Sequence, residues 1–211
     1  MADAAFWDRI ADRYAARSLG DEAAYAATLE RARAHLRPAD TALEIGCGTG
    51  RTAIALAPSV ASYHATDLAP RMIEIARSRP EGAAAANLSF SVAEATEAPE
   101  APGAVYDAVL AFNLLHLLDD LPAGLREIAA HLRPGGRLIS KTPCLRDLSL
   151  PVRLPVGLLV RPMRLAGLAP ALRFLGAREL ERSIAEAGFR IVETGDFPAR
   201  RAQRLVVAER A

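Results

Sequence analysis

Short runs of β-branched and aliphatic residues alternate with helical patterns through the middle of the sequence, and this order constrains the fold more than any other feature. The runs predict strands at 41–46, 60–67, 87–92, 105–112 and 136–142, with helical patterns at 51–58, 70–79 and 122–132 between them. Such alternation is typical of βαβ units, in which helices connect the parallel strands of one sheet. The sequence therefore predicts an α/β fold.

Both ends of the chain add elements to this core. Helices are predicted at 4–17 and 22–36, the second with Asp21 as its N-cap. A helix at 177–187 is followed by strands at 189–196 and 204–209. A parallel pair would need a much longer crossover than the link between these strands, so we expect an antiparallel hairpin. Arg133-Pro134-Gly135-Gly136 predicts a helix end and a turn before the strand at 136.

The composition is that of a folded domain, with 51% hydrophobic residues and 26 basic against 25 acidic side chains. Two cysteines, Cys47 and Cys144, are too few for a disulfide framework or an all-cysteine zinc site, so no metal is expected. The first residues lack the apolar run of a signal peptide, and no apolar stretch reaches the ~18 residues that suggest a membrane span. We expect one cytoplasmic domain over 1–211.

A glycine-rich sequence, Glu44-Ile45-Gly46-Cys47-Gly48-Thr49-Gly50, directly follows the first predicted strand. Alternating glycines allow a tight turn and would bring backbone N–H groups against a ligand, with a helix N-terminus behind them. Asp67 ends the second strand, where a carboxylate can accept both hydroxyls of a ribose. The pattern predicts a nucleotide-type site. Counted from Gly48, the looser dinucleotide fingerprint fits through Ala53, so an NAD(P)-dependent oxidoreductase stays open as an alternative.

Five strings in order resemble the motif set of class I S-adenosylmethionine-dependent methyltransferases: ALEIGCGTG, HATDLAPRMIEIAR, SVAEATEAP, YDAVLAFNLLHLL and LRPGGRLI. The resemblance spans about 40–142, and the terminal helix and hairpin match the family too. It implies a Rossmann-like seven-stranded sheet, mostly parallel with an antiparallel last strand, with helices on both faces and an N-terminal helical cap. It also implies S-adenosylmethionine as cofactor and S-adenosylhomocysteine as product.

The resemblance assigns cofactor contacts to individual residues. The glycines would follow the methionine and ribose, Asp67 would hold the ribose, and Leu68 with Met72 would pack on the adenine. Glu94 stands where the family commonly has aspartate and would meet the adenine amino edge. FWDRIADRYA resembles the N-terminal cap of small-molecule methyltransferases, a helix that folds over the cofactor, and the helical spacing of Phe6, Trp7 and Ile10 leaves ordinary core contact as the alternative. The full expected set is Tyr14, Glu44, Gly46, Cys47, Gly48, Gly50, Asp67, Leu68, Met72, Glu94 and Ala95.

His116 and Asn113 follow the fourth strand, at the edge where open α/β sheets bind their ligands. His116 is the candidate general base, since an ordinary pKa near ~6.5 suits proton removal, and packing under the cofactor is its alternative role. Asn113 either orients the methionine end or the acceptor, or caps a helix. The expected reaction is in-line methyl transfer to N, O or S of a small molecule. Because Phe112-Asn113-Leu114-Leu115 lacks the Pro-Pro-aromatic string of base-amine methyltransferases, no nucleic acid partner is expected.

We divide the domain into an N-terminal helical cap (1–38), a cofactor-binding core (39–142), an insertion (143–176) and a terminal helix with its hairpin (177–211). The insertion interrupts the alternation of strands and helices. Within 145–178, six arginines and one acid, Asp147, give a local charge of +5. The prolines of this stretch argue against a continuous amphipathic helix. Insertions of this length usually form lids or binding elements. The alternatives are a lid over a lipophilic or acidic substrate, contact with an anionic membrane surface, and a solvated rim. A non-catalytic membrane- or partner-binding protein on this scaffold is the other alternative.

Overall fold

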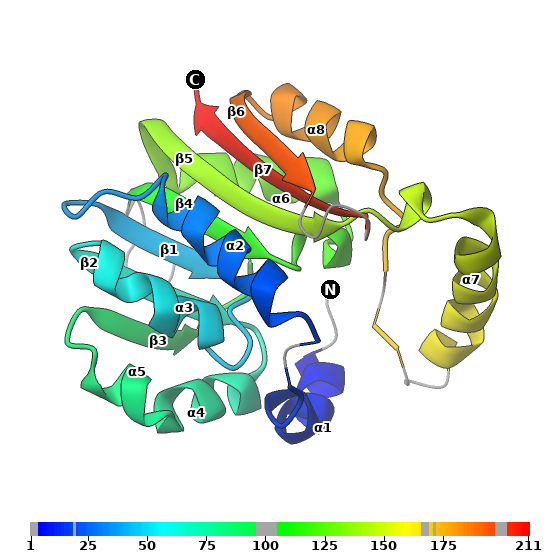
Figure 1. Cartoon of the computed structure of the whole chain (residues 1–211), viewed down its shortest axis with the longest axis horizontal. Helices are drawn as coiled ribbons and strands as arrows, with labels where there is room; N and C mark the ends of the chain where they lie inside the picture. Colours follow the sequence, from blue (N-terminus) through cyan, green and yellow to red (C-terminus); the bar gives the residue numbers. More distant parts are fainter. Residues whose placement is uncertain (1–3, 19, 96–104, 166–168, 171, 197–201) are drawn as a thin grey trace.

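The computed structural model describes residues 4–211 except 19, 96–104, 166–168, 171 and 197–201. A seven-stranded sheet runs through its centre in the order β3-β2-β1-β4-β5-β7-β6 (Figure 1). The strands are β1 (Thr41–Ile45), β2 (Ser62–Asp67), β3 (Leu88–Val92), β4 (Tyr106–Phe112), β5 (Leu132–Pro143), β6 (Phe189–Asp196) and β7 (Gln203–Arg210).

The strand order reverses at the centre of this sheet. β1 pairs in parallel with both β2 and β4, so the chain first moves outward to β3 and then returns to the other side of β1. β7 lies between β5 and β6 and is antiparallel to both. The Rossmann-like, mostly parallel sheet with an antiparallel last strand is confirmed. Ligands of such sheets bind at the carboxyl ends of the strands, where the order reverses.

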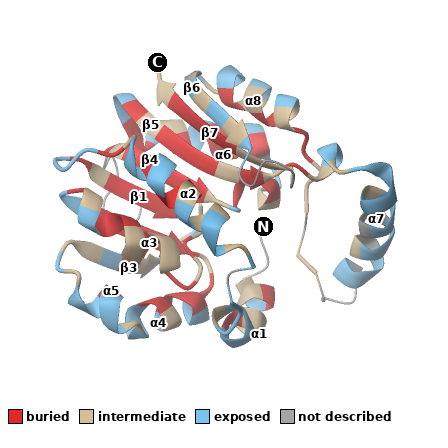
Figure 2. Cartoon of the chain, viewed as in Figure 1, coloured by how far each residue is buried: buried red, intermediate tan, exposed pale blue. Residues whose placement is uncertain are grey.

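Helices cover both faces of the sheet because its strands alternate apolar side chains between two cores. Ala42 and Leu110 belong to the cluster under α2, α3 and α4, whereas Leu43 and Ile45 belong to the cluster under α6 and α8. Figure 2 shows the buried strands between helices whose outer sides are exposed. The helices are α1 (Ala4–Ala15), α2 (Glu22–Arg33), α3 (Arg51–Leu56), α4 (Pro70–Ser78), α5 (Pro80–Ala84), α6 (Leu121–Ala130), α7 (Leu150–Leu165) and α8 (Ala177–Glu186).

Two aspartates begin helices in the expected manner. Asp21 caps α2 by accepting a hydrogen bond from the Ala24 amide at 2.9 Å, which confirms its predicted role. Asp120 caps α6 by accepting from the Ala123 amide at 3.0 Å. The second cap fixes the chain that leaves β4, and this connection forms part of the candidate site below.

The fifth strand differs from its prediction. β5 begins at Leu132 rather than 136, and the Arg133–Gly136 stretch lies inside the strand instead of forming a turn before it. Tyr106 of β4 pairs with Leu132, and Ala108 already pairs with Arg137, so the extra residues form a bulge. Gly135, with φ +73°, supplies the left-handed backbone that this bulge needs. The short helix α5 was not predicted.

The insertion after β5 also differs from its prediction, because α7 is a continuous helix of 16 residues with Pro155 and Pro162 inside it. Each proline removes one backbone hydrogen bond, but the helix stands apart from the sheet, where water can satisfy the freed carbonyls (Figure 1). None of the helices in the described part of the chain combines the length and apolarity needed to cross a bilayer.

The N-terminal helix α1 packs on α4. Ala11 lies in a small apolar cluster with Ala69 and Met72. On the outer side, the Arg71 guanidinium pairs with the Asp12 carboxylate at 2.7 Å. From the sheet side, the Arg51 guanidinium donates to the backbone carbonyls of residues 15 and 17, each at 3.2 Å. These contacts hold α1 beside the loop that follows β1.

Candidate functional site

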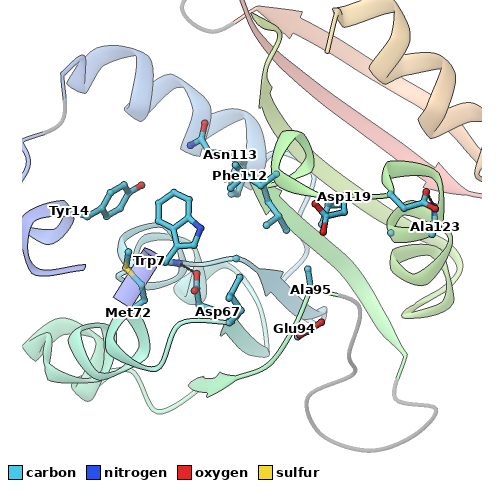
Figure 3. Close-up of a pocket in the computed structure, with 18 residues that line it drawn as sticks. Trp7, Tyr14, Asp67, Met72, Glu94, Ala95, Phe112, Asn113, Asp119 and Ala123 are labelled. Carbon is cyan, nitrogen blue, oxygen red and sulfur yellow. Dashed lines mark hydrogen bonds between the residues drawn. The ribbon is translucent and has the colours of Figure 1, made fainter. Parts of the chain in front are cut away.

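Two joined hollows lie at the carboxyl ends of β1, β2 and β4, beside α1. The first has a volume of about 250 Å³ and contains Asp67 (Figure 3). The second has a volume of about 290 Å³ and contains Glu44. Both are lined by a shared set of residues, namely Tyr14, Gly46, Gly48, Phe112 and Asn113. The site therefore suits an elongated ligand that passes across the glycine loop.

The glycine loop requires its glycines for different reasons. Gly46, Gly48 and Gly50 have φ values of +67°, +54° and +75°. A Cβ atom on Gly46 would lie 2.8 Å from the Leu114 side chain, and one on Gly50 would lie 2.8 Å from the Ala76 Cβ. A Cβ on Gly48 would meet only the Tyr14 ring, at 3.8 Å, on the side of the hollows. Gly48 thus keeps space free for a ligand, whereas Gly50 allows close packing of the loop and lines neither hollow.

Three backbone amides of this loop are paired within the protein instead of facing a ligand. The Cys47 amide donates to the Thr66 carbonyl at 2.8 Å, the Gly48 amide to Asp67 Oδ2 at 2.8 Å, and the Gly50 amide to the Cys47 carbonyl at 3.1 Å. The prediction that these amides face a ligand is wrong, because the tight turn pairs them internally. What the loop offers a ligand is the open space beside its glycines and the side chains around it.

Asp67 joins the loop to the next strand and still faces the first hollow. Besides the Gly48 amide, its carboxylate accepts from the Ala69 amide at 3.0 Å, and Ala69 rather than Asp67 is the N-cap residue of α4. Burial raises the pKa of Asp67, while these amide hydrogen bonds oppose the rise. A carboxylate has about four acceptor sites, so lone pairs remain for ligand hydroxyls.

Glu44 places a buried acid against the second hollow. Its side chain accepts a hydrogen bond from the Tyr63 hydroxyl at 2.8 Å, and the residue is only 2% exposed. Burial raises the pKa of Glu44 to about 8, so the carboxyl group is poised to ionise when a cation arrives. A ligand with a positive group at this end would therefore be stabilised.

Glu44 also predicts a pH dependence of stability. Its folded-state pKa of about 8 exceeds the ordinary value of 4.5, so the folded chain holds this proton more tightly than the unfolded chain does. Its contribution to stability is therefore complete below pH 4.5 and is lost as the pH rises through about 8. We expect the Tm of the wild type to fall across this window relative to that of Glu44→Gln, which cannot ionise. Thermal denaturation across pH is the measurement, and parallel curves would contradict the prediction.

Most of the other predicted residues come together in these hollows. The first hollow is lined by Leu68, Met72, Glu94 and Ala95 (Figure 3). Asn113 lines both hollows. Asn113 has φ +53°, a strained value for a residue other than glycine, and directly follows β4. Its predicted roles toward ligands remain predictions.

The two cysteines are buried thiols. Cys47 lines the second hollow, and burial raises its pKa well above the ordinary value. Burial likewise raises the pKa of Cys144 to about 11. Neither thiol is activated as a nucleophile, because activation requires a lowered pKa.

His116 lies outside both hollows. It borders a neighbouring small hollow of about 230 Å³, which shares Leu117, Leu118 and Asp119 with the first. Burial lowers the pKa of His116 to about 4, so the imidazole is neutral at pH 7. Its Nδ1 atom is buried without a hydrogen-bond partner among the described residues. Its predicted role as a base thus requires an acceptor that reaches this hollow.

The site contains residues that sequence reasoning missed. Trp7 lines the first hollow and packs edge-on against Tyr14, with ring centroids 6.3 Å apart, although its helical spacing suggested a core position. The connection after β4 supplies most of the others, and the string that continues from Asn113 was the available signal. The missed residues of the first hollow are Trp7, Phe112, Leu114, Leu117, Leu118, Asp119, Asp120, Ala123 and Gly124. Those of the second hollow are Arg17, Ser18, Gly20, Tyr25, Thr49, Arg51 and Thr52, besides Phe112.

Comparisons with known proteins agree with this geometry. The sequence matches the family model described as a methyltransferase domain over residues 14–194. It is 32% identical to an O-methyltransferase of Pyrenophora dematioidea over 76% of this chain and 58% of that protein. It is 34% identical to the ubiquinone biosynthesis O-methyltransferase of Methylocella silvestris over 69% of this chain and 56% of that protein. The chain thus spans little more than half the length of these relatives.

A solved structure gives the same result for the fold. The SAM-dependent methyltransferase of Thermotoga maritima superposes with a TM-score of 0.72 at 22% identity, covering 98% of this chain and 99% of that one. The family model and the two relatives favour the methyltransferase interpretation over the oxidoreductase alternative.

Proposed function

Since this chain belongs to the class I S-adenosylmethionine-dependent methyltransferases, we propose that it methylates a small lipophilic molecule, at an oxygen atom in preference to nitrogen or sulfur. The observation that carries this proposal is the pair of joined hollows, with Asp67 in one and Glu44 in the other. The preference for oxygen rests on the two relatives above, which are both named O-methyltransferases.

The residues present fit S-adenosylmethionine along its whole length. Asp67 would accept from the ribose hydroxyls, and Leu68 with Met72 would pack on the adenine. Glu44 would neutralise the ammonium group, and burial makes this charge pairing strong. Arg17 and Arg51 also line the second hollow and would face the carboxylate.

The cofactor supplies an electrophilic methyl group on a positively charged sulfur, so the protein needs little covalent chemistry. An acceptor attacks the methyl carbon from the side opposite sulfur, and positive charge disperses in the transition state. Alignment of the reactants and exclusion of water would then provide most of the rate. Tyr14 and Trp7 of α1 border the first hollow and are placed to exclude water.

The remainder of the first hollow suits an apolar acceptor. Its wall beyond the cofactor residues includes the apolar Leu117, Leu118, Ala123 and Gly124, with Asp119 and Asp120 as the acidic residues among them. The small hollow beside His116 shares part of this wall and also contacts Leu172 of the insertion. An acceptor larger than the first hollow can extend in this direction.

His116 provides a test of the acceptor side. We expect His116→Ala to leave the affinity for S-adenosylhomocysteine unchanged, because His116 lies outside the cofactor hollows, and to lower turnover about a hundredfold. The wild-type pH profile of kcat/KM would carry a limb near pH 4 that the variant loses. His131→Ala is the control, since that histidine is equally buried, at 8% exposure, but lies beyond the opposite edge of the sheet. Unaltered turnover in His116→Ala would contradict the role of His116 as a general base and would leave packing as its role.

The proposed activity is tested by incubating the protein with S-adenosylmethionine and pooled small metabolites. We expect one or more lipophilic hydroxyl compounds to gain the mass of one methylene group, together with release of S-adenosylhomocysteine. Binding of S-adenosylhomocysteine without methylation of any pooled compound would contradict the proposed acceptor class. Absence of cofactor binding would contradict the proposal as a whole.

A further inference from the structure

Helix α7 exposes more large apolar side chains than any other helix in the described part of the chain. Leu158 is 74% exposed and Leu159 is 59% exposed, although apolar side chains of a folded protein normally face its core. Figure 2 shows the helix mostly exposed and standing away from the sheet. The exposed apolar side chains of α7 are Leu150, Val152, Leu154, Leu158, Leu159 and Met163.

The exposed apolar residues of α7 form two stripes, and two arginines lie between them. Val152, Leu159 and Met163 recur at the spacing of one helical stripe and are all exposed. Arg153 and Arg164 lie nearly a third of a turn away at 3.6 residues per turn, and the other apolar stripe lies beyond them, formed by Leu150, Leu154 and Leu158. Such a helix, with arginines beside an apolar face, is the type that lies in the plane of a membrane interface.

The positive charge around α7 indicates which kind of surface can bind it. Within 145–178 the sequence has six arginines and a single acid, Asp147, whose carboxylate accepts from the Ala177 amide at 2.7 Å. A second copy of the chain, packed helix against helix, would bring the same positive charge against this one. An anionic lipid surface is both apolar and negative, so it matches both the apolar side chains and the arginines.

We propose that α7 binds to the surface of an anionic lipid bilayer, with Val152, Leu159 and Met163 toward the acyl chains and Arg153 and Arg164 toward the phosphates. The helix does not need to span the membrane for this role. A groove of about 740 Å³ lies beside α7, with apolar walls that include Leu154, Leu158 and Phe174 and with Arg146, Arg153 and Arg164 also lining it. It shares Arg164 and Leu172 with the hollow of His116, so a lipophilic molecule could pass from the bilayer toward the site. The lipid docking itself does not depend on methyl transfer.

Vesicle flotation of the full chain tests this proposal. We expect the wild type to float with vesicles of phosphatidylcholine and phosphatidylglycerol, and much less with phosphatidylcholine alone. The double variant Leu159→Gln/Met163→Gln should bind the anionic vesicles about tenfold or more weakly, because it loses apolar burial. Arg153→Gln/Arg164→Gln should lose a similar factor, and added salt should weaken wild-type binding. Val192→Gln, which replaces an exposed apolar residue on β6, should bind like the wild type.

Leu159, Met163 and Arg164 are exposed, and among the described residues the half-buried Arg153 donates only to the Arg146 carbonyl, so the circular dichroism and Tm of the variants should stay close to those of the wild type. No flotation of the wild type with anionic vesicles would overturn the proposal. Equal flotation of the wild type and Leu159→Gln/Met163→Gln would also overturn it, because another surface would then bind the lipid. Sedimentation velocity supplies the third outcome. A dimer that Leu159→Gln/Met163→Gln dissociates, without any vesicle binding, would assign the apolar stripe to a second copy and reject the bilayer.

Discussion

Replacing Asp67 with alanine is expected to lower the affinity for S-adenosylhomocysteine about a hundredfold or more, which isothermal titration calorimetry can measure. The variant loses the proposed acceptor of the ribose hydroxyls, and hydrogen bonds to charged groups contribute about 1.5–3 kcal/mol each. It also leaves the Gly48 and Ala69 amides without their partner. We therefore expect a loss of roughly 1–3 kcal/mol in the free energy of unfolding as well.

Asp40→Ala separates these two effects. Asp40 is similarly buried, at 7% exposure, and accepts from the Arg37 amide at 2.9 Å, but it precedes β1 at the opposite edge of the sheet. This control should lose stability while it keeps its cofactor affinity. If Asp67→Ala bound S-adenosylhomocysteine as tightly as the wild type, the assignment of Asp67 to the ribose would be wrong.

Gly50→Ala is expected mainly to lower the stability of the protein, and Gly48→Ala mainly to lower its affinity for the cofactor. Each places an alanine at positive φ, which costs about 1–2 kcal/mol. At position 50 the new Cβ would also overlap Ala76, at 2.8 Å, and Phe90, at 2.9 Å, so we expect a total loss of about 3 kcal/mol or more in stability. At position 48 the Cβ has space in the protein but occupies the ligand's side of the loop. There we expect cofactor affinity to fall at least about tenfold with only the strain cost in stability.

Gly135→Ala measures the strain alone. Gly135 has φ +73°, and a Cβ there would meet no atom within 4 Å. The difference in the free energy of unfolding between Gly50→Ala and Gly135→Ala therefore reports the overlap, and urea denaturation can measure both. Equal losses in these two variants would show that Gly50 is required only for its backbone conformation.

The sheet could be predicted from sequence because short runs rich in β-branched and aliphatic residues alternate along the chain with helical patterns. The same applies to most site residues, since Asp67 and Asn113 lie at strand ends, where chain order alone places them at one edge. The amide pairing in the glycine loop could not be predicted in this way. The pattern of glycines shows where the chain turns, but the hydrogen bonds depend on how closely β1 and β2 approach, which only the folded structure contains.

The insertion after β5 was predicted less well for a different reason. Pro155 and Pro162 argue locally against a helix, and α7 forms in spite of them. From the sequence we know that each proline inside a helix removes one backbone hydrogen bond. The sequence does not show that the freed carbonyls lie where water can bind them. His116 was placed at the correct edge of the sheet, and its separation from the cofactor hollows followed from the short turn at Leu115–Leu117 that carries it.

The ion pair that holds α1 on α4 has a consequence for the site. Trp7 borders the first hollow and Tyr14 borders both, so a displacement of α1 would change the width of the site. On its outer side this helix is held by the exposed pair of Arg71 and Asp12, which dissolved ions weaken. We therefore expect added salt to loosen α1 at the edge of the site, so that the ionic composition of the surroundings affects the site through a helix that performs no chemistry itself.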